Sequence, residues 1–238
     1  MQFIVTASDT ISTFEAIILG IVQGLTEFLP ISSTAHLRIV PAFAGWEDPG
    51  SAFTAVVQLG TMAAVLLYFR HDLWNMARAF LKTLTGERPL WRTPDVDGRL
   101  GWYIVLGTIP ISIIGFALKN VIEDEFRSLE LIATVMILFS LVLYAADTRG
   151  PRVRETSDLT LSDGIKIGFA QALALVPGVS RSGATISAGL LLGLTREAAT
   201  RYSFLLSVPA VVLSGLFELR KVSGGELDIA PTIVATIF

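Results

Sequence analysis

The residues best suited to chemistry lie in two short polar segments of an otherwise apolar chain. The first segment begins with Gln23 and Glu27, which are four positions apart. On a helix this spacing places both side chains on one face, where they can offer two oxygens to one cation or to a phosphate-bound water. Pro30 follows closely and predicts a break in the helix.

Hydroxyl groups and a histidine follow that proline. Three consecutive hydroxyl residues are expected near the start of a new helix: Ser32, Ser33 and Thr34. The first N–H groups of a helix have no intrahelical partner and attract anions. His36 adds an imidazole, the type of side chain that most often serves as a general base.

The second polar segment reads PGVSRSG over residues 177–183. Its Arg181 can fork onto phosphate oxygens, and Gly183 lets the backbone approach a ligand closely. Ser180 and Ser182 add hydroxyl groups at a second expected helix start. Two helix N-termini, one guanidinium and several hydroxyls suit a polyanion, and a phosphate or diphosphate fits best.

Structural roles compete with these functional ones. Serine and threonine side chains within a membrane often bond the backbone of their own helix, and Gln171 can bridge two helices. Glu27 and Arg181 can form a structural ion pair, and His36 can be an ordinary core residue. A carboxylate and a guanidinium are nevertheless costly in lipid, so a functional role is the default for both.

The surrounding sequence is that of a helical membrane protein. Of its 238 residues, 52% are hydrophobic and only 16% are charged, and the mean hydropathy is +0.64. The apolar blocks are much longer than the roughly ten-residue strands of a membrane barrel. This pattern excludes a disordered chain, a nucleic-acid-binding module and a small disulfide scaffold. The sequence contains no cysteine, so thiol chemistry is excluded too.

Charge-free intervals predict four membrane crossings, because about 20 apolar residues span the hydrocarbon. These intervals are 51–69, 100–118, 131–146 and 202–217. Two further apolar regions, 14–45 and 163–195, are interrupted by charges and by Pro, Gly or Ser residues. Each half is only about 14 residues long, too short to cross alone, so each region is predicted to form a re-entrant helical hairpin.

Loop charges predict the orientation. Residues 70–99 hold six basic and four acidic residues, and residues 147–166 hold four basic ones, so both loops are expected in the cytoplasm. The acidic loop 119–130 is then outside, the first hairpin enters from outside, and the second enters from the cytoplasm. The GIVQ of residues 20–23 recurs as GFAQ at 168–171, which suggests an inverted repeat.

We therefore predict an all-α integral membrane protein with a single transmembrane domain over residues 1–238. Its polytopic helices include two re-entrant helical hairpins in an inverted-topology repeat.

The two polar segments together carry a family resemblance. The (Glu/Gln)-x-x-x-Glu element, the following Pro-x-Ser-Ser-Thr-x-His and the later Pro-Gly-x-Ser-Arg-Ser-Gly resemble the bacitracin-resistance family of undecaprenyl-diphosphate phosphatases. The resemblance covers nearly the whole chain. It implies roles for seven matching residues: Gln23, Glu27, Ser33, Thr34, His36, Ser180 and Arg181.

Three departures from the family pattern carry expectations of their own. Gln23 stands where several members have Glu, which suggests a weaker cation site. Ala35 replaces the usual glycine before His36, which suggests a more restricted backbone at the hairpin tip. Members also continue past a final pair of membrane helices, so a chain ending at Phe238 is expected to lack the last C-terminal helices.

The resemblance implies a multi-pass enzyme of the plasma membrane that hydrolyses C55 isoprenyl diphosphate to the monophosphate and phosphate. This reaction recycles the lipid carrier for peptidoglycan and cell-wall synthesis and confers bacitracin resistance. A divalent cation, Mg²⁺ or Ca²⁺, is expected on Gln23 and Glu27, and the active site is expected to face the outer side. The expected partners are undecaprenyl diphosphate, membrane lipids and, as an open alternative, a second copy of the chain, but no nucleic acid.

The residues suggest hydrolysis by charge neutralisation with an activated oxygen nucleophile. Arg181 and hairpin N–H groups would hold the diphosphate. The nucleophile is either Ser33, activated by His36 or Glu27, or a water that they position. A transporter is the competing hypothesis, because broken helices in inverted repeats are also typical of transporters, and such a protein could flip a polyprenyl phosphate.

Overall fold

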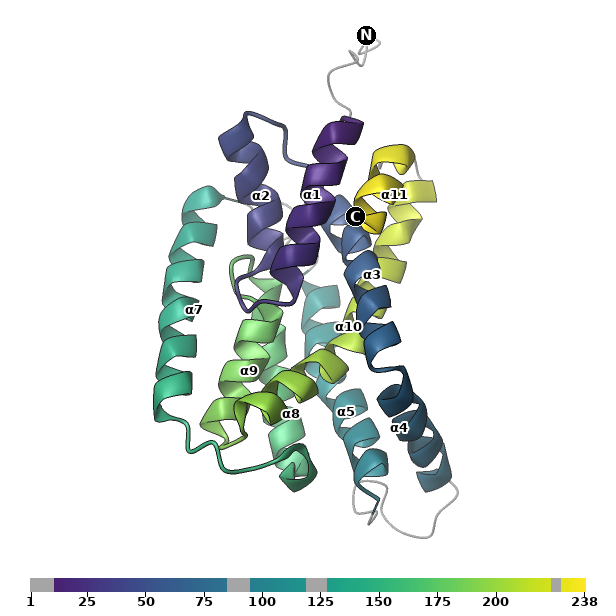
Figure 1. Ribbon diagram of the computed structural model, residues 1–238, viewed down its shortest axis with the longest axis vertical. Helices are drawn as coiled ribbons and strands as arrows, with labels where there is room; N and C mark the ends of the chain where they lie inside the picture. Colours follow the sequence, from purple (N-terminus) through teal and green to yellow (C-terminus); the bar gives the residue numbers. More distant parts are fainter. Residues whose placement is uncertain (1–10, 85–94, 119–127, 224–227) are drawn as a thin grey trace.

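The computed structural model describes residues 11–84, 95–118, 128–223 and 228–238, which form helices joined by turns (Figure 1). The α-helices are α1 (Thr13–Glu27), α2 (Ser33–Ala44), α3 (Gly50–Tyr68), α4 (Arg70–Thr83), α5 (Val96–Ala117), α7 (Leu129–Arg149), α8 (Leu161–Ala172), α9 (Arg181–Leu191), α10 (Arg196–Ser223) and α11 (Ile229–Ile237). Two short 3₁₀ turns are η2 (Thr156–Asp158) and η3 (Leu173–Leu175). The described ranges contain no strand, which confirms the all-α class.

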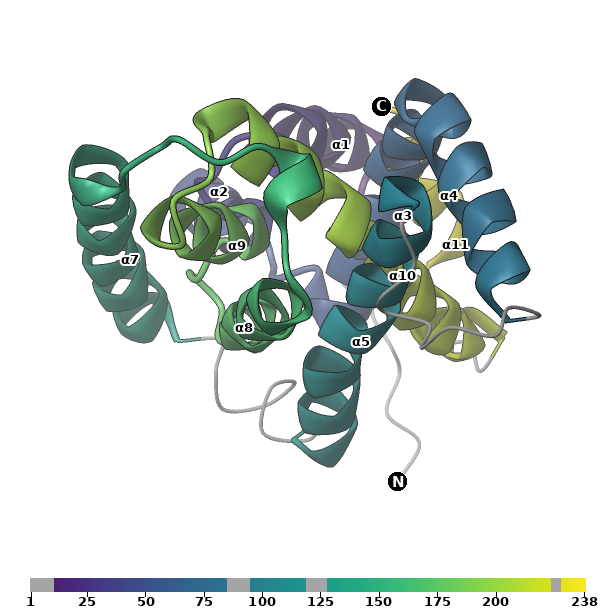
Figure 2. The same cartoon turned by 90° about the horizontal axis from the view of Figure 1, so that it is seen from below.

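Four of these helices are long and apolar enough to cross a membrane: α3, α5, α7 and the part of α10 from Arg196 to Phe217. They overlap the four predicted crossings, because transfer from water to the hydrocarbon core costs least free energy for a segment without charges. Seen from below, α7 and α4 lie at opposite edges of the bundle (Figure 2). Only 11% of the apolar window of α7 is buried, so most of this helix faces away from the other described helices. The acidic residues 123–125, on which the outward loop was predicted, lie outside the described residues.

Helices α1 and α2 form one helical hairpin, and α8 and α9 form a second that points the opposite way (Figure 1). The local sequence explains both turns. Helix α1 ends shortly before Pro30, and α8 gives way to η3, to Pro177 and to Gly178, whose φ is +97°. Ser32 and Ser180 then cap the two helices that follow.

Glycines let both hairpins pack closely on neighbouring helices. A Cβ atom at Gly168 of α8 would lie 2.4 Å from the carbonyl oxygen of Gly107 in α5. A Cβ atom at Gly20 of α1 would lie 2.5 Å from the carbonyl oxygen of Ala235 in α11. The first hairpin is thus supported by α11 and the second by α5, while α3 and α10 pack against each other.

Because no side chain fits at this crossing, Gly168→Ala is expected to push α8 away from α5. Overpacking of this kind costs about 1–3 kcal/mol, so the Tm in detergent should fall by at least about 2 °C. Gly24→Ala is the matched control, since a Cβ there would meet its nearest neighbour at an ordinary 3.5 Å. Thermal unfolding followed by circular dichroism measures both variants, and equal Tm values would contradict the close crossing.

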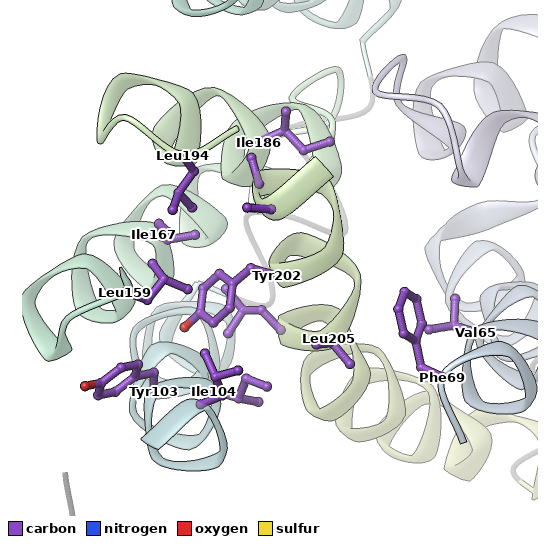
Figure 3. Packing of buried hydrophobic residues seen from close by; sticks show 14 of the residues in the cluster. Val65, Phe69, Tyr103, Ile104, Leu159, Ile167, Ile186, Leu194, Tyr202 and Leu205 are labelled. Atoms are coloured by element: carbon purple, nitrogen blue, oxygen red, sulfur yellow. The ribbon is translucent and has the colours of Figure 1, made fainter. Parts of the chain in front are cut away.

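The larger hydrophobic core holds the second hairpin against α5 and α10 (Figure 3). Tyr202 of α10 is fully buried in it and packs with Ile104 of α5 and Ile167 of α8. A smaller cluster holds the first hairpin and consists of Ala16, Leu19, Leu37, Phe53, Val57 and Ala235. Both hairpin turns are therefore carried on packed helices.

An ion pair ties down the base of the second hairpin. Arg154 Nη2 donates to Asp163 Oδ2 at 2.7 Å, and Arg154 Nη1 donates to the carbonyl oxygen of Leu192 at 2.8 Å. Burial by itself raises the pKa of Asp163, but hydrogen bonds from Arg154 and Thr160 outweigh it and hold this pKa below the ordinary value. Folding therefore favours the carboxylate form.

This pKa depression predicts a loss of stability in acid. The contribution of Asp163 is complete above its unfolded-state pKa of about 4 and is lost as the pH falls through the lower folded-state pKa. We expect Asp163→Asn to lower the Tm at pH 7 and to reduce the drop in Tm between pH 5 and pH 3. Glu47→Gln, at an exposed position, is the control. An unchanged acid-induced drop in Asp163→Asn would argue against this contribution.

Candidate active site

An ion pair between Glu27 and Arg181 joins the two hairpins. Glu27 is the last residue of α1 and Arg181 is the first residue of α9, 154 positions later. Arg181 Nη2 donates to Glu27 Oε1 at 2.5 Å, and both side chains are largely buried. The two sequence segments predicted to form one site therefore meet.

The second carboxylate oxygen of Glu27 contacts the rest of the first segment. Ser33 Oγ donates to Glu27 Oε2 at 2.5 Å, and Gln23 Nε2 donates to the same oxygen at 3.0 Å. Gln23 Nε2 also donates to Thr61 Oγ1 of α3, at 3.3 Å. The hydroxyl of Ser33 thus faces a carboxylate able to accept its proton.

Arg181 is fixed on its other side by α10. Its Nη1 donates to the carbonyl oxygen of Ser207 at 3.2 Å. Thr185, one turn further along α9, shares a buried hydrogen bond of 2.6 Å with Ser203 and donates to the Arg181 carbonyl oxygen. The guanidinium is therefore oriented before any substrate binds.

The two hairpin tips also touch directly. Ser182 Oγ donates to the carbonyl oxygen of Leu29 at 3.4 Å. A Cβ at Gly183 would lie 3.4 Å from the carbonyl oxygen of Pro30 and 3.0 Å from Ser180 Cβ. Ser180 Oγ accepts from the Gly183 N–H and so caps α9. Gly183 therefore contributes close packing between the hairpins.

The backbone at the first tip turns at Ser32, before Ala35. Ala35 lies inside α2 and is fully buried, and the positive φ of +67° falls on Ser32. Ser32 also caps α2, because its Oγ accepts from the Ala35 N–H at 3.4 Å. The left-handed turn residue at this tip is therefore Ser32, while a more restricted backbone at Ala35 stays a prediction.

A cavity of about 520 Å³ opens between the hairpins. One part of its lining carries the predicted polar residues: Glu27, Ser32, Ser33, Thr34, Ser180, Arg181 and Ser182. Another part is apolar and includes Ile111, Phe116, Leu175, Leu213 and Phe217. A charged group and an apolar tail can therefore occupy adjoining parts of one cavity.

Three predicted residues, Gln23, His36 and Gly183, are not part of this cavity wall. His36 Nδ1 lies 2.8 Å from the carbonyl oxygen of Ser32. A carbonyl only accepts, so Nδ1 is the donor of this hydrogen bond. His36 is therefore oriented by the turn of the hairpin.

Comparison with known proteins decides the family. The family described as "Bacitracin resistance protein BacA" matches residues 16–238 of the chain. The chain belongs to this family.

Relatives of this BacA chain cover most of its length. A Nocardioides protein named "Undecaprenyl-diphosphatase" is 55% identical over 94% of the chain and 81% of its own length. A Streptomyces griseus protein of the same name is 52% identical over 95% of the chain and 81% of its own length. A Myxococcus xanthus protein, also named "Undecaprenyl-diphosphatase", is 53% identical over 90% of the chain and 71% of its own length. These names support the phosphatase prediction and give no support to the transporter alternative.

The site also contains polar residues that lie outside the two predicted polar segments. Thr54, Gln58 and Thr61 lie on one face of α3, where Thr54 and Gln58 line the cavity and Thr61 holds Gln23. Their spacing of four and three positions places them on one face of an apolar helix, so the sequence could have indicated that this face is polar. The hydrogen bond from Arg181 to the Ser207 carbonyl oxygen could not be predicted, because a backbone contact is independent of residue type.

A divalent cation would find few protein ligands at this site. Within the described ranges, no cluster of three or more His, Cys, Asp or Glu side chains is close enough to hold a metal ion. Gln23 turns its nitrogen toward Glu27, and its buried Oε1 has no hydrogen-bond partner among the described residues. A single carboxylate with hydroxyl neighbours fits a cation that takes its other ligands from water and substrate phosphates, as Mg²⁺ commonly does.

Proposed function

We propose that this chain is an undecaprenyl-diphosphatase, which hydrolyses undecaprenyl diphosphate to the monophosphate and phosphate. One observation carries the proposal: in a BacA-family chain, the Glu27–Arg181 pair and Ser33 converge on a single cavity between two hairpins. By recycling the lipid carrier, the enzyme supports cell-wall synthesis and bacitracin resistance.

Substrate binding uses charge and backbone donors together. The diphosphate displaces Glu27 from Arg181, whose planar guanidinium can then bind two phosphate oxygens. The first turns of α2 and α9 supply N–H groups with positive partial charge, near Ser33 and Ser182. The apolar part of the cavity receives the first isoprene units, and the remaining tail stays in the bilayer.

Ser33 is the nucleophile that the geometry favours. Glu27 accepts the Ser33 proton, and Oγ forms a bond to the terminal phosphorus while the bridging P–O bond breaks. Prenyl monophosphate leaves with the bridging oxygen and its electron pair, and a water then hydrolyses the phosphoserine. Arg181 stabilises the charge on the equatorial oxygens throughout.

We expect Ser33→Ala to lower phosphate release by at least about a hundredfold, because the covalent route is lost. Acid-quenching the parent enzyme during turnover of prenyl [β-³²P]diphosphate should leave label on Ser33. Ser140→Ala, at an exposed position of α7 outside the cavity wall, is the control for loss of a hydroxyl group. Full activity of Ser33→Ala would instead assign the attack to a water held by Glu27 and His36.

A divalent cation is proposed on Glu27, with Gln23 as a second ligand if its amide turns. When bound, Mg²⁺ or Ca²⁺ would supply charge neutralisation on the diphosphate. Gln23 in its present rotamer orients Glu27 through its nitrogen.

The placement in the membrane is also proposed. Both hairpins are re-entrant, the two halves form an inverted repeat within one domain over residues 1–238, and the site opens to the outer side of the plasma membrane. Supporting this, the hairpins run in opposite directions (Figure 1), and α11 packs on α1 as α5 packs on α8. Gln23 and Gln171, the paired amides of the repeat, are both buried.

Phosphate release from a short-chain prenyl diphosphate in detergent tests the proposed reaction without transport. Turnover that stops with EDTA and returns with Mg²⁺ is expected. If EDTA leaves turnover unchanged, the proposed divalent cation is contradicted. If the folded protein shows no turnover at all, the proposed hydrolysis is contradicted.

A further inference from the structure

Helix α4 presents a basic and aromatic face whose role the phosphatase reaction leaves unexplained. The helix begins directly after the span α3 ends at Tyr68, so it lies at the membrane boundary. Figure 2 shows it at the rim of the bundle. This is the side that the loop charges predict as cytoplasmic.

The inner face of α4 is firmly held. Met76, Ala79 and Thr83 are buried, and Trp102 of α5 donates from Nε1 to Thr83 Oγ1 at 2.7 Å. The rings of Phe80 and Trp102 lie 4.6 Å apart. The helix therefore presents its outer face in a fixed orientation.

The outer face carries His71, Trp74, Arg78, Leu81 and Lys82, all of them exposed. Their successive spacings of three, four, three and one positions keep them on one side of a helix. Trp74 is 64% exposed, and the guanidinium of Arg78 lies 6.0 Å from the centre of its ring, a cation–π arrangement.

This face contains basic and no acidic residues. The acidic residue of α4, Asp72, points elsewhere and accepts a hydrogen bond of 2.7 Å from Arg201 of α10. Arg78 and Lys82 thus add positive charge beside Trp74 and Leu81, two side chains that suit the boundary between headgroups and acyl chains.

We propose that this outer face of α4 binds the headgroups of acidic phospholipids. Arg78 and Lys82 attract the phosphodiester, while Trp74 and Leu81 enter the upper acyl region. Each basic residue near an anionic membrane surface contributes about 1 kcal/mol, or about fivefold in affinity. The protein would then gather acidic lipid at α4, apart from the diphosphate cavity, whose wall includes no α4 residue.

Native mass spectrometry of the purified chain, titrated with phosphatidylglycerol or phosphatidylcholine, tests this lipid site. The parent should bind phosphatidylglycerol several-fold more tightly, and NaCl should reduce that preference. R78Q/K82Q should weaken phosphatidylglycerol binding by at least about fivefold and leave phosphatase activity on a soluble substrate unchanged.

R149Q/K166Q is the matched control, because it removes the same charge from exposed positions outside α4. It should bind phosphatidylglycerol nearly as the parent does. An equal loss in this control, or unchanged binding in R78Q/K82Q, would overturn the site. The salt titration of the parent needs no variant, and a lipid preference that is absent or insensitive to NaCl would overturn it too.

Discussion

Replacing Arg181 with alanine is expected to lower kcat/KM for a prenyl diphosphate by at least about a thousandfold. An arginine that stabilises a transferring phosphoryl group commonly contributes a factor of about 10³–10⁵. Here the guanidinium is already oriented by the Ser207 carbonyl group and faces the cavity. Phosphate release by purified protein in detergent measures the effect.

The contributions of the charge of Arg181 and of its two-pronged guanidinium geometry to activity can be measured separately. Arg181→Lys keeps the charge but offers a single ammonium group, so it should recover only part of the activity. Arg149→Ala, at the exposed end of α7, is the control and should behave as the parent. Near-parent activity in Arg181→Ala would show that this residue has a structural role only.

Glu27→Gln is expected to lower phosphate release by about 10²–10⁴-fold, since it removes the acceptor for the Ser33 proton. The amide is nearly the same size, so the loss reflects chemistry more than packing. Glu15→Gln, in the first turn of the same helix and outside the cavity wall, should keep the parent's activity. A loss of only a few-fold in Glu27→Gln would exclude Glu27 as the base.

Stability measurements distinguish catalysis from a purely structural ion pair. Each single replacement leaves a largely buried charge without its partner, so Glu27→Gln and Arg181→Gln should each lower the Tm. The double variant E27Q/R181Q removes both charges and should recover much of the Tm but none of the activity. If the double variant recovered both the Tm and the activity, the ion pair would have a structural role only.

Much of the fold could be predicted from the sequence, because lipid penalises charge so strongly. Charge-free intervals located α3, α5, α7 and α10, since long apolar runs have few alternatives in such a chain. For the same reason, Glu27 and Arg181 were predicted to share a site despite their separation of 154 residues.

The remaining details depend on tertiary packing and could not be predicted. The amide of Gln23 turns its nitrogen toward Glu27 because Thr61 accepts from the same group. The strain falls on Ser32, with a φ of +67°, because the turn after Pro30 must re-enter a helix at once. The contact between Gly168 and Gly107 depends on how two helices cross, which residue spacing alone leaves undetermined.

A structure with a non-hydrolysable prenyl methylenediphosphonate bound would show where the diphosphate sits relative to Arg181 and Ser33. We expect its phosphonate oxygens to contact Arg181 and the first turns of α2 and α9, with the Ser33 hydroxyl facing the terminal phosphorus. Phosphonate bound elsewhere, with Arg181 still paired to Glu27, would contradict this placement.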